Sequence, residues 1–284
     1  MTKPSLQRPE FPRSNGYDPD WVLTHQMGPN ALWLIEWLTR DLELKPGMRV
    51  LDLGCGTAMT SIFLAREFGV QVWAADLWVD PDENWGRIRE AGVDDRVCPL
   101  KAEAHALPFA NEFFDAMLSV DSYQYYGTDD LYLGYLSRFV KPGGTLGMVA
   151  AGLTNDFEQG IPAHLTRPQS HGAPFWEDEC ICFHTASWWR ALWERSNRVE
   201  VTVADTMPDG WKHWRDFESV VERSGKARFP SCAEALEADG GRYLGLVRVI
   251  AKRAKDTAMN LYDPSLIAKM KASNPSQSSS QSSS

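Results

Sequence analysis

The sequence predicts an α/β domain built on a doubly wound, parallel sheet. Two observations support this fold class. First, apolar runs of strand length alternate with helical stretches of roughly ten residues throughout 45–150, which is typical of βαβ units. Second, the run "RVLDL", which begins at Arg49, follows a Pro-Gly turn and is apolar enough to be buried on both faces of a sheet. The 284 residues suit one such domain with insertions or a small cap.

Two helices are expected ahead of the sheet. Residues 1–16 are rich in Pro and predict an irregular arm, whereas apolar residues recur at helical spacing over 21–42. Gly28-Pro29 should divide that stretch into two helices. The core is then expected to contain, in chain order, strand 50–53, helix 57–68, strand 71–75, helix 82–91, strands 96–100 and 116–120, helix 129–139, a turn at 141–144 and strand 145–150.

The rest of the chain is expected to cover the sheet and complete it. Residues 151–184 lack periodicity, and a loop of that length inside a compact domain is usually functional. The Ser-rich C-terminal end cannot bury apolar surface and is expected to be disordered. Between them we expect helix 185–196 capped by Thr185 or Ser187, strand 198–206, helices 211–225 and 231–238, and strand 242–253.

Composition narrows the class of protein. The net charge of −9 disfavours nucleic acid as a partner, because phosphate binding requires a surplus of Lys and Arg. No apolar stretch reaches the roughly 18 residues of a membrane span, and the first residues lack the apolar core of a signal peptide. Five Cys without framework spacing indicate a reduced protein. We therefore expect a cytoplasmic chain without stable membrane insertion, and its oligomeric state stays open.

The segment "RVLDLGCGTAMTSIFLAREFGVQVWAADL" carries the main functional signal. Gly54-Cys55-Gly56 follows the first strand, where a parallel sheet leaves a crevice and the next helix offers free N–H groups. Glycines allow a ligand to approach the backbone closely. Asp76, at the end of the second strand, can accept both hydroxyls of a ribose. These features suit NAD and S-adenosylmethionine equally.

Two details favour the methyl donor over the dinucleotide. A dinucleotide fingerprint places a third Gly where this chain has Met59. Asp52 also stands where a pyrophosphate would meet a negative charge, whereas a carboxylate there suits a ligand that carries an ammonium and a sulfonium. S-adenosylmethionine carries both groups.

At this point the chain resembles the class I S-adenosylmethionine-dependent methyltransferases. "VLDLGCGT" matches their first motif, "EAHALPFANEFFDAMLSVDSYQYY" (103–126) matches their adenine-binding segment and fourth strand, and "RFVKPGGTLGMV" matches the helix, turn and strand that follow. The match covers roughly residues 45–150, with Glu103 in place of the commoner Asp. The resemblance implies a seven-stranded sheet that ends in an antiparallel hairpin, for which 198–206 and 242–253 are candidates.

The resemblance also implies roles for particular residues. Asp52 and Gly54–Gly56 would hold the methionine part of the cofactor, Asp76 the ribose, and Glu103-Ala104 the adenine. The expected cofactor residues are Asp52, Gly54, Cys55, Gly56, Asp76, Leu77, Glu103, Ala104 and Ser119. The implied divisions are 1–44 (arm and covering helices), 45–150 (cofactor-binding core), 151–254 (substrate cap and last strands) and 255–284 (C-terminal extension).

The methyl acceptor is expected above the same edge of the sheet, where Trp, His and Tyr concentrate. Asp121 and His171 are the candidate proton acceptors, although a loop histidine such as His164 or His171 is commonly only solvated. Aromatic rings with carboxylates suit an amine through cation–π contact, and equally a flat aromatic or a prenyl or sterol skeleton. The candidate substrate residues are Tyr17, His25, Tyr123, Tyr125, Trp176, Trp211 and Trp214.

The cysteines indicate no metal site. Cys180-x-Cys182-x-His184 is spaced too tightly for structural zinc and lacks a second pair nearby, while on a strand the two cysteines would share one face. Cys98 together with that pair leaves the dispersed cysteines of trivalent-arsenic methyltransferases as an open alternative.

The sequence thus predicts methyl transfer from S-adenosylmethionine to N or O of a small organic molecule, with an amine or aromatic acceptor favoured. Three alternatives stay open: methylation of a prenyl or sterol-like lipid at carbon, a cofactor-binding protein without catalysis, and an NAD-dependent oxidoreductase. Met59 argues against the last of these.

Overall fold

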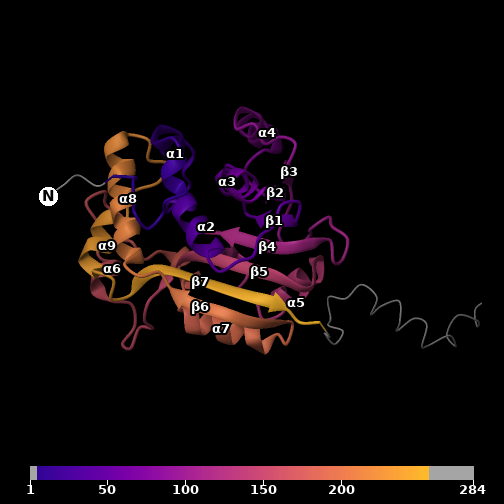
Figure 1. Cartoon of the computed structure of the whole chain (residues 1–284). Coiled ribbons are helices and arrows are strands. Elements are labelled where there is room, and N and C mark those ends of the chain that lie inside the picture. The colour runs from indigo at the N-terminus through magenta and orange to yellow at the C-terminus, as the bar shows by residue number, and fades with distance from the viewer. Residues whose placement is uncertain (1–4, 256–284) are drawn as a thin grey trace, which may run out of the picture.

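The computed structural model describes residues 5–255, which form one seven-stranded sheet with helices on both faces (Figure 1). The strand order is β3-β2-β1-β4-β5-β7-β6, and β7 alone runs opposite to the other six strands. The predicted fold class is therefore confirmed, including the antiparallel pair at the end. The strands are β1 (Arg49–Leu53), β2 (Gln71–Asp76), β3 (Val97–Lys101), β4 (Phe114–Val120), β5 (Val140–Leu153), β6 (Val199–Thr206) and β7 (Leu244–Arg253).

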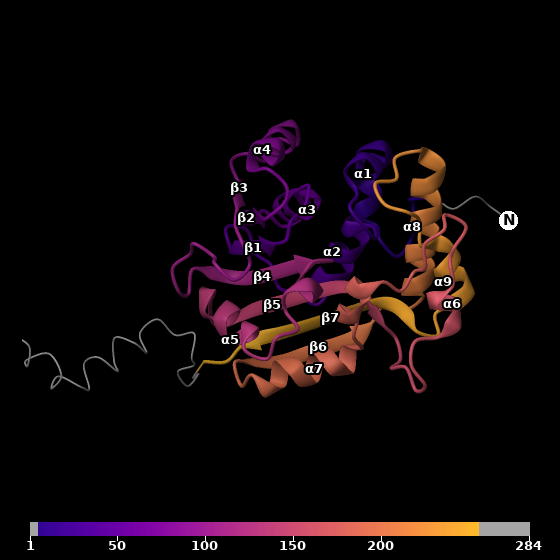
Figure 2. The ribbon, with the colours of Figure 1, turned by 180° about the vertical axis from the view of Figure 1, so that it is seen from behind.

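Two apolar cores, one on each face, hold the helices to the sheet. One core takes side chains from α2, α3, α4, α8 and α9, and the other takes them from α5 and α7. Figure 2 shows α5 and α7 on the face away from α1, α2 and α3. The helices are α1 (Pro19–His25), α2 (Ala31–Thr39), α3 (Met59–Phe68), α4 (Pro81–Glu90), α5 (Tyr132–Leu136), α6 (Ala163–Thr166), α7 (Ala186–Arg195), α8 (Gly210–Ser224) and α9 (Ala233–Asp239), with 3₁₀ turns η1 (Ser14–Gly16), η2 (Tyr123–Tyr125), η3 (Ser137–Phe139) and η4 (Asp178–Cys182).

Local chemistry explains the helix starts. The Asn30 side chain accepts from the N–H groups of Leu32 and Trp33, so α2 begins directly after Gly28-Pro29 as predicted. Thr185, one of the two expected caps, accepts from Trp188 N at 3.3 Å.

Two predicted elements differ from the structure. The expected helix 129–139 shrinks to α5 followed by η3, and the expected turn at 141–144 lies inside the long strand β5. Gly143 adopts φ +77° there, and the β4–β5 register shifts between Phe114 and Ala116, so the turn sequence becomes an irregularity of the strand. The predicted disordered tail lies outside the described residues.

The N-terminal helix is fastened to the loop that follows α8. Lys226 Nζ contacts the Asp20 carboxylate and Thr24 Oγ1, and Gln26 Nε2 donates to the Lys226 carbonyl at 3.1 Å. These contacts join segments about two hundred positions apart in sequence and place them over the carboxyl ends of β1 and β4 (Figure 1). Within residues 5–255, no helix has the length and apolar character needed to cross a membrane.

Candidate active site

A cavity of about 870 Å³ lies between the carboxyl ends of β1, β2 and β4 and the segments that cover them. We call its two parts the glycine end and the aromatic end. The glycine end is lined by Gly54, Gly56, Asp76, Leu77, Trp78, Glu103 and Ala104. The aromatic end is lined by Asp121, Tyr125, Phe175, Glu177, Glu179, Cys180, Phe183, Trp214, Glu218, Arg228, Phe229 and Cys232. One continuous space therefore joins the predicted cofactor motif to the aromatic cap.

The glycine end requires its two glycines for steric reasons. Gly54 has φ +75°, and a Cβ there would lie 1.9 Å from Ser122 Oγ. Gly56 has φ +52°, and a Cβ there would lie 3.0 Å from Met27 Sδ. Other residues would be strained at both positions, because the backbone is left-handed and the neighbours are close. The turn is thereby enclosed by the segment after β4 and by the α1–α2 connection.

Asp76 fixes the far side of the glycine end. Its Oδ2 accepts from Gly56 N at 2.8 Å, and its Oδ1 accepts from Trp78 N at 2.8 Å and Val79 N at 2.9 Å. A carboxylate offers about four lone-pair positions, so one position on Oδ2 is left for a ligand that enters the cavity. Asp76 thus links the β1 and β2 loops and still presents an acceptor to the space between them.

Asp52 lies beneath the glycine end and is 0 % exposed. Its Oδ2 accepts from Thr60 Oγ1 at 2.6 Å and Ser61 Oγ at 2.5 Å, while Oδ1 has no hydrogen-bond partner among the described residues. Burial raises the pKa of Asp52 to about 6, and the charge of Asp76 adds to that rise against the two hydroxyl hydrogen bonds. A buried carboxylate oxygen without a hydrogen-bond partner would be stabilised by a polar or cationic group bound next to it.

The predicted cofactor residues separate into two layers. Gly54, Gly56, Asp76, Leu77, Glu103 and Ala104 line the cavity. Asp52, Cys55 and Ser119 form the buried layer below, where Ser119 Oγ donates to the Leu53 carbonyl at 2.7 Å. Glu103 accepts from His105 N and pairs with His105 Nδ1 at 2.8 Å, which lowers the pKa of the Glu103 carboxyl.

Asp121 stands where the glycine end meets the aromatic end. It adopts φ +50°, an uncommon conformation for a residue other than Gly, and Gln124 Nε2 and Ala151 N both donate to its Oδ1. A Cβ on Gly28 would lie 2.7 Å from Asp121 Oδ2, so the α1–α2 connection packs directly on the carboxyl. Burial raises the pKa of Asp121. The strained backbone thus holds this carboxyl at the cavity wall.

Glu218 is a cavity residue that the sequence did not single out. It follows Trp214 by one helical turn on α8, so both side chains face the cavity. Burial raises the pKa of Glu218 to about 7, against the opposing effects of the Cys232 N–H and Trp214, and the charge of Asp121 adds to the rise. An acidic residue between Trp214, Phe217 and Val221 on the buried face of a strongly amphipathic helix was the available signal.

Two of the predicted substrate residues, Tyr125 and Trp214, line the cavity. Tyr17 instead packs on Phe63, with its hydroxyl 3.2 Å from Glu67 Oε1, and His25 Nδ1 lies 2.8 Å from the Trp21 carbonyl. Tyr17, which precedes α1, and His25, the last residue of α1, do not line the cavity, whereas the backbone at the end of α1 lies close to it. The His25 carbonyl accepts from Thr57 Oγ1 at 2.6 Å beside the Gly-rich turn.

The other predicted aromatic residues are structural in their contacts. Tyr123 is fully buried among Trp189 and Trp193 on the opposite face of the sheet. Trp176 packs against Phe157, and Trp211 covers Gly241, where a Cβ would lie 2.3 Å from its indole. These rings shape the cap without lining the cavity.

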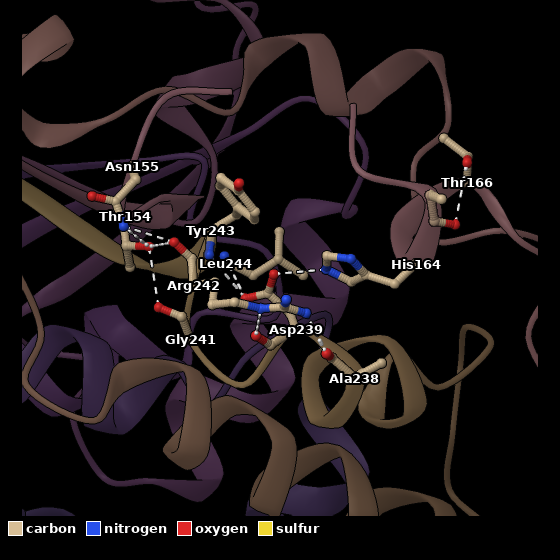
Figure 3. Close-up of polar contacts among 11 residues, drawn as sticks. Thr154, Asn155, His164, Thr166, Ala238, Asp239, Gly241, Arg242, Tyr243 and Leu244 are labelled. Carbon is tan, nitrogen blue, oxygen red and sulfur yellow. Dashed lines mark hydrogen bonds and ion pairs between the residues drawn. The ribbon is translucent and has the colours of Figure 1, made fainter. Parts of the chain in front are cut away.

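The two loop histidines lie outside the cavity. His171 is exposed, and its Nδ1 accepts from Ala173 N at 3.4 Å. His164 Nε2 contacts Asp239 Oδ1 at 2.9 Å, and Asp239 Oδ2 accepts from the N–H groups of Tyr243 and Leu244 (Figure 3). The His164–Asp239 pair therefore joins α6 to α9, and Asp239 also binds the backbone at the start of β7. Asp121 is the one predicted proton acceptor that the structure brings to the cavity.

The cysteines form no cluster. Cys180 and Cys182 lie in η4 rather than on a strand, and Cys98 is exposed on β3 at the edge of the sheet. Within residues 5–255, no group of three or more His, Cys, Asp or Glu side chains is arranged to hold a metal ion.

Comparison with known proteins identifies the domain. Residues 50–144 match a family of methyltransferase domains. The methyltransferase GfsG of Streptomyces halstedii is 31 % identical over 132 residues, which are 46 % of this chain and 48 % of that protein. The chain spans about half, or less, of the first curated relatives that it matches.

Solved structures share the fold. The geranyl diphosphate C-methyltransferase of Streptomyces coelicolor A3(2) superposes with a TM-score of 0.58 at 21 % identity, covering 78 % of this chain and 79 % of its own. Phosphoethanolamine N-methyltransferase 2 of Haemonchus contortus gives 0.62 at 17 %, covering 88 % and 59 %. The fold shared with these structures is Rossmann-like, with the Gly-rich turn at the carboxyl ends of its parallel strands. Residues 50–144 of this chain thus match a methyltransferase domain, and the sequence relative named above is a methyltransferase as well.

Proposed function

We propose that this protein transfers the methyl group of S-adenosylmethionine to nitrogen or oxygen of a small organic acceptor, an amine or an aromatic compound. The continuous cavity carries this proposal. Its volume of about 870 Å³ lies toward the upper end of ordinary small-molecule sites, so it has room for a cofactor and an acceptor together.

The residues of the glycine end fit the cofactor. Asp76 retains an acceptor position for a ribose hydroxyl, Glu103 and Ala104 border the place expected for adenine, and Gly54 and Gly56 leave room for a close ligand. The orphaned Oδ1 of Asp52 lies below and favours a positive charge above it. When bound, S-adenosylmethionine supplies an electrophilic methyl group on a sulfonium.

The protein's own contribution is to align the acceptor, exclude water and remove a proton. The α1–α2 connection and the loop after α8 line one side of the cavity and are held together by the bond from Gln26 Nε2 to the Lys226 carbonyl. Asp121 and Glu218 are the two carboxyls at the aromatic end whose pKa is raised by burial, and a base with a pKa near the working pH is the most effective proton acceptor.

A second acceptor class is favoured by the apolar rim of the cavity. Trp78, Tyr125 and Phe229 line the cavity and are exposed, with Trp78 79 % exposed. A prenyl or sterol-like acceptor methylated at carbon could cover such a rim, and the geranyl diphosphate enzyme is one structural neighbour that acts at carbon.

Calorimetric titration with S-adenosylmethionine, S-adenosylhomocysteine and NADH tests the cofactor assignment. We expect micromolar binding of both adenosyl ligands and none of NADH. Release of S-adenosylhomocysteine is then followed with panels of amines, phenols and prenyl alcohols. Binding of NADH alone would support an oxidoreductase, and cofactor binding without turnover on any panel would support a non-catalytic protein.

A further inference from the structure

The aromatic end contains two inward carboxyls that lack a counter-charge. No Lys, Arg or His among residues 5–255 forms an ion pair with Asp121 or Glu218. Among the described lining residues of this end, Arg228 is the single basic side chain, and it is exposed at the mouth with Nη2 3.2 Å from the Thr24 carbonyl. The interior of this end is therefore acidic.

The groups around Glu218 have opposing effects on its ionised form. The Cys232 N–H and Trp214 both act to stabilise the carboxylate, whereas burial and the charge of Asp121 oppose it. Trp214 is 5 % exposed, yet its Nε1 makes no hydrogen bond of ordinary geometry within the described part of the chain. Cys232 and Trp214 therefore offset only part of the effect of burial on Glu218, and no basic side chain within residues 5–255 pairs with its carboxyl.

Aromatic rings stand beside these carboxyls. The Phe175 ring centroid lies 6.1 Å from that of Trp214 and 6.3 Å from that of Phe183, and Tyr125 lines the same space. Aromatic faces attract a cation within about 6 Å, and the attraction grows when the site is desolvated. Rings and carboxyls together are the chemistry that recognises an ammonium group.

We propose that the aromatic end is an ammonium site in which Glu218 is the anionic partner of the acceptor's charged nitrogen, with Asp121 and the Trp214 ring completing the enclosure. This inference rests on the proposed function, since it names the acceptor class of the same cavity as an amine. A protonated amine bound there would first pass its N–H proton to the Glu218 carboxylate, and the lone pair thus freed on nitrogen would attack the methyl group as the bond from the methyl carbon to the sulfonium breaks. It also makes Glu218 the specificity-determining residue, because a neutral acceptor of the same shape would gain nothing from a carboxylate.

Ligand binding at this site is expected to depend on pH. An ammonium ligand stabilises ionised Glu218, so its affinity should rise as pH increases toward about 7 and level off above it. The titratable and charged groups that face the same space are Asp121 directly after β4, Tyr125 in η2, Glu177, Glu179 and Cys180 before and within η4, Arg228 after α8, and Cys232 before α9.

The test uses the full chain saturated with S-adenosylhomocysteine. Two probes are titrated by calorimetry: (meta-hydroxymethylphenyl)trimethylammonium and its neutral carbon isostere, meta-tert-butylbenzyl alcohol. We expect the cation to bind at least about 10-fold more tightly than the isostere at about pH 8, and this preference to shrink at about pH 5.5. Glu218→Gln should remove most of the preference and Asp121→Asn part of it. Glu222→Gln, one turn further along α8 and exposed, is the matched control.

Each outcome decides the proposal. Equal binding of the two probes, binding of neither, or an unchanged preference in Glu218→Gln would overturn the ammonium site while leaving methyl transfer intact. Failure of the wild type to bind S-adenosylhomocysteine would overturn the proposed function itself. Retained S-adenosylhomocysteine binding in Glu218→Gln shows that this variant is folded, and Asp121→Asn supplies a second measurement on the same site.

Discussion

The two ends of the cavity are built in different ways. The glycine end comes from the loops after β1, β2 and β3, which lie within about fifty residues of one another and meet because parallel strands end at one edge. The aromatic end combines the α1–α2 connection, the end of β4, the loop before η4, and α8 with the loop after it. One end is therefore fixed by local geometry, and the other depends on how distant segments dock.

The two ends also hold buried carboxyls in different settings. Asp52 lies in the floor and is bonded by hydroxyls of α3, whereas Glu218 lies in the wall beside Trp214 and Cys232. Burial raises the pKa of both groups. A positive charge beside either carboxyl would stabilise its ionised form. The two carboxyls together therefore suit a cationic cofactor at one end and a cationic acceptor at the other.

The largest effect should come from the turn of the glycine end. Gly54→Ala places a Cβ 1.9 Å from Ser122 Oγ at φ +75°, and we expect a loss of about 3 kcal/mol or more in the free energy of unfolding. Gly92→Ala is the matched control, since it has φ +66° and open space around the added Cβ. Urea unfolding of both variants measures the difference, and similar losses would show that close approach at Gly54 is unimportant.

The next effect isolates the cofactor contact. Asp76→Ala should weaken S-adenosylhomocysteine binding by roughly 1–3 kcal/mol, because ribose hydroxyls would lose their acceptor in a covered site. Asp80→Ala removes only the cap of α4, where Asp80 accepts from Asp82 N at 2.9 Å, and should leave the affinity unchanged. Wild-type affinity in Asp76→Ala would contradict the ribose assignment.

Stability should respond to Glu218 in a pH-dependent way. The pKa of Glu218 is raised from 4.5 to about 7 in the folded protein, so the folded state binds more protons than the unfolded chain between those values. The contribution of Glu218 to the free energy of unfolding therefore falls as the pH rises between these two pKa values. Glu218→Gln should raise the free energy of unfolding by about 1–2 kcal/mol at about pH 8. At about pH 4 it should change little, because Glu218 is then protonated in both states. Denaturant unfolding at both pH values measures this, and the exposed variant Glu222→Gln is the control; an equal effect at both would contradict the linkage.

The smallest effect separates two neighbouring tryptophans. Trp214→Phe should weaken binding of the trimethylammonium probe by roughly 3-fold and leave S-adenosylhomocysteine binding unchanged, because Trp214 lines only the aromatic end. Trp211→Phe should change neither affinity, since Trp211 covers Gly241. Parallel calorimetric titrations measure both; equal losses of probe affinity in the two variants would indicate a general role of α8 in folding.

The contrast between the ends explains how much could be predicted from the sequence. The order of strands and helices, the Gly54–Gly56 turn and Asp76 followed from local spacing, because a βαβ unit brings its own loop residues together. Trp176 and Trp211 were predicted to line the cavity because they are aromatic residues of the cap, yet their rings pack elsewhere. The position of Glu218 at the cavity could not be predicted from local spacing. It depends on the packing of α8 against the loop before η4 and the loop before α9.

A crystal structure of the protein with S-adenosylhomocysteine and the trimethylammonium probe would test the central claim most directly. The account predicts the adenosyl group beside Asp76 and Glu103, and the ammonium within contact of Glu218 and Trp214. Adenosyl density away from the Gly54–Gly56 turn would contradict the assignment of the glycine end. A probe seated outside the aromatic end, with its nitrogen away from Glu218, would contradict the account of the acceptor.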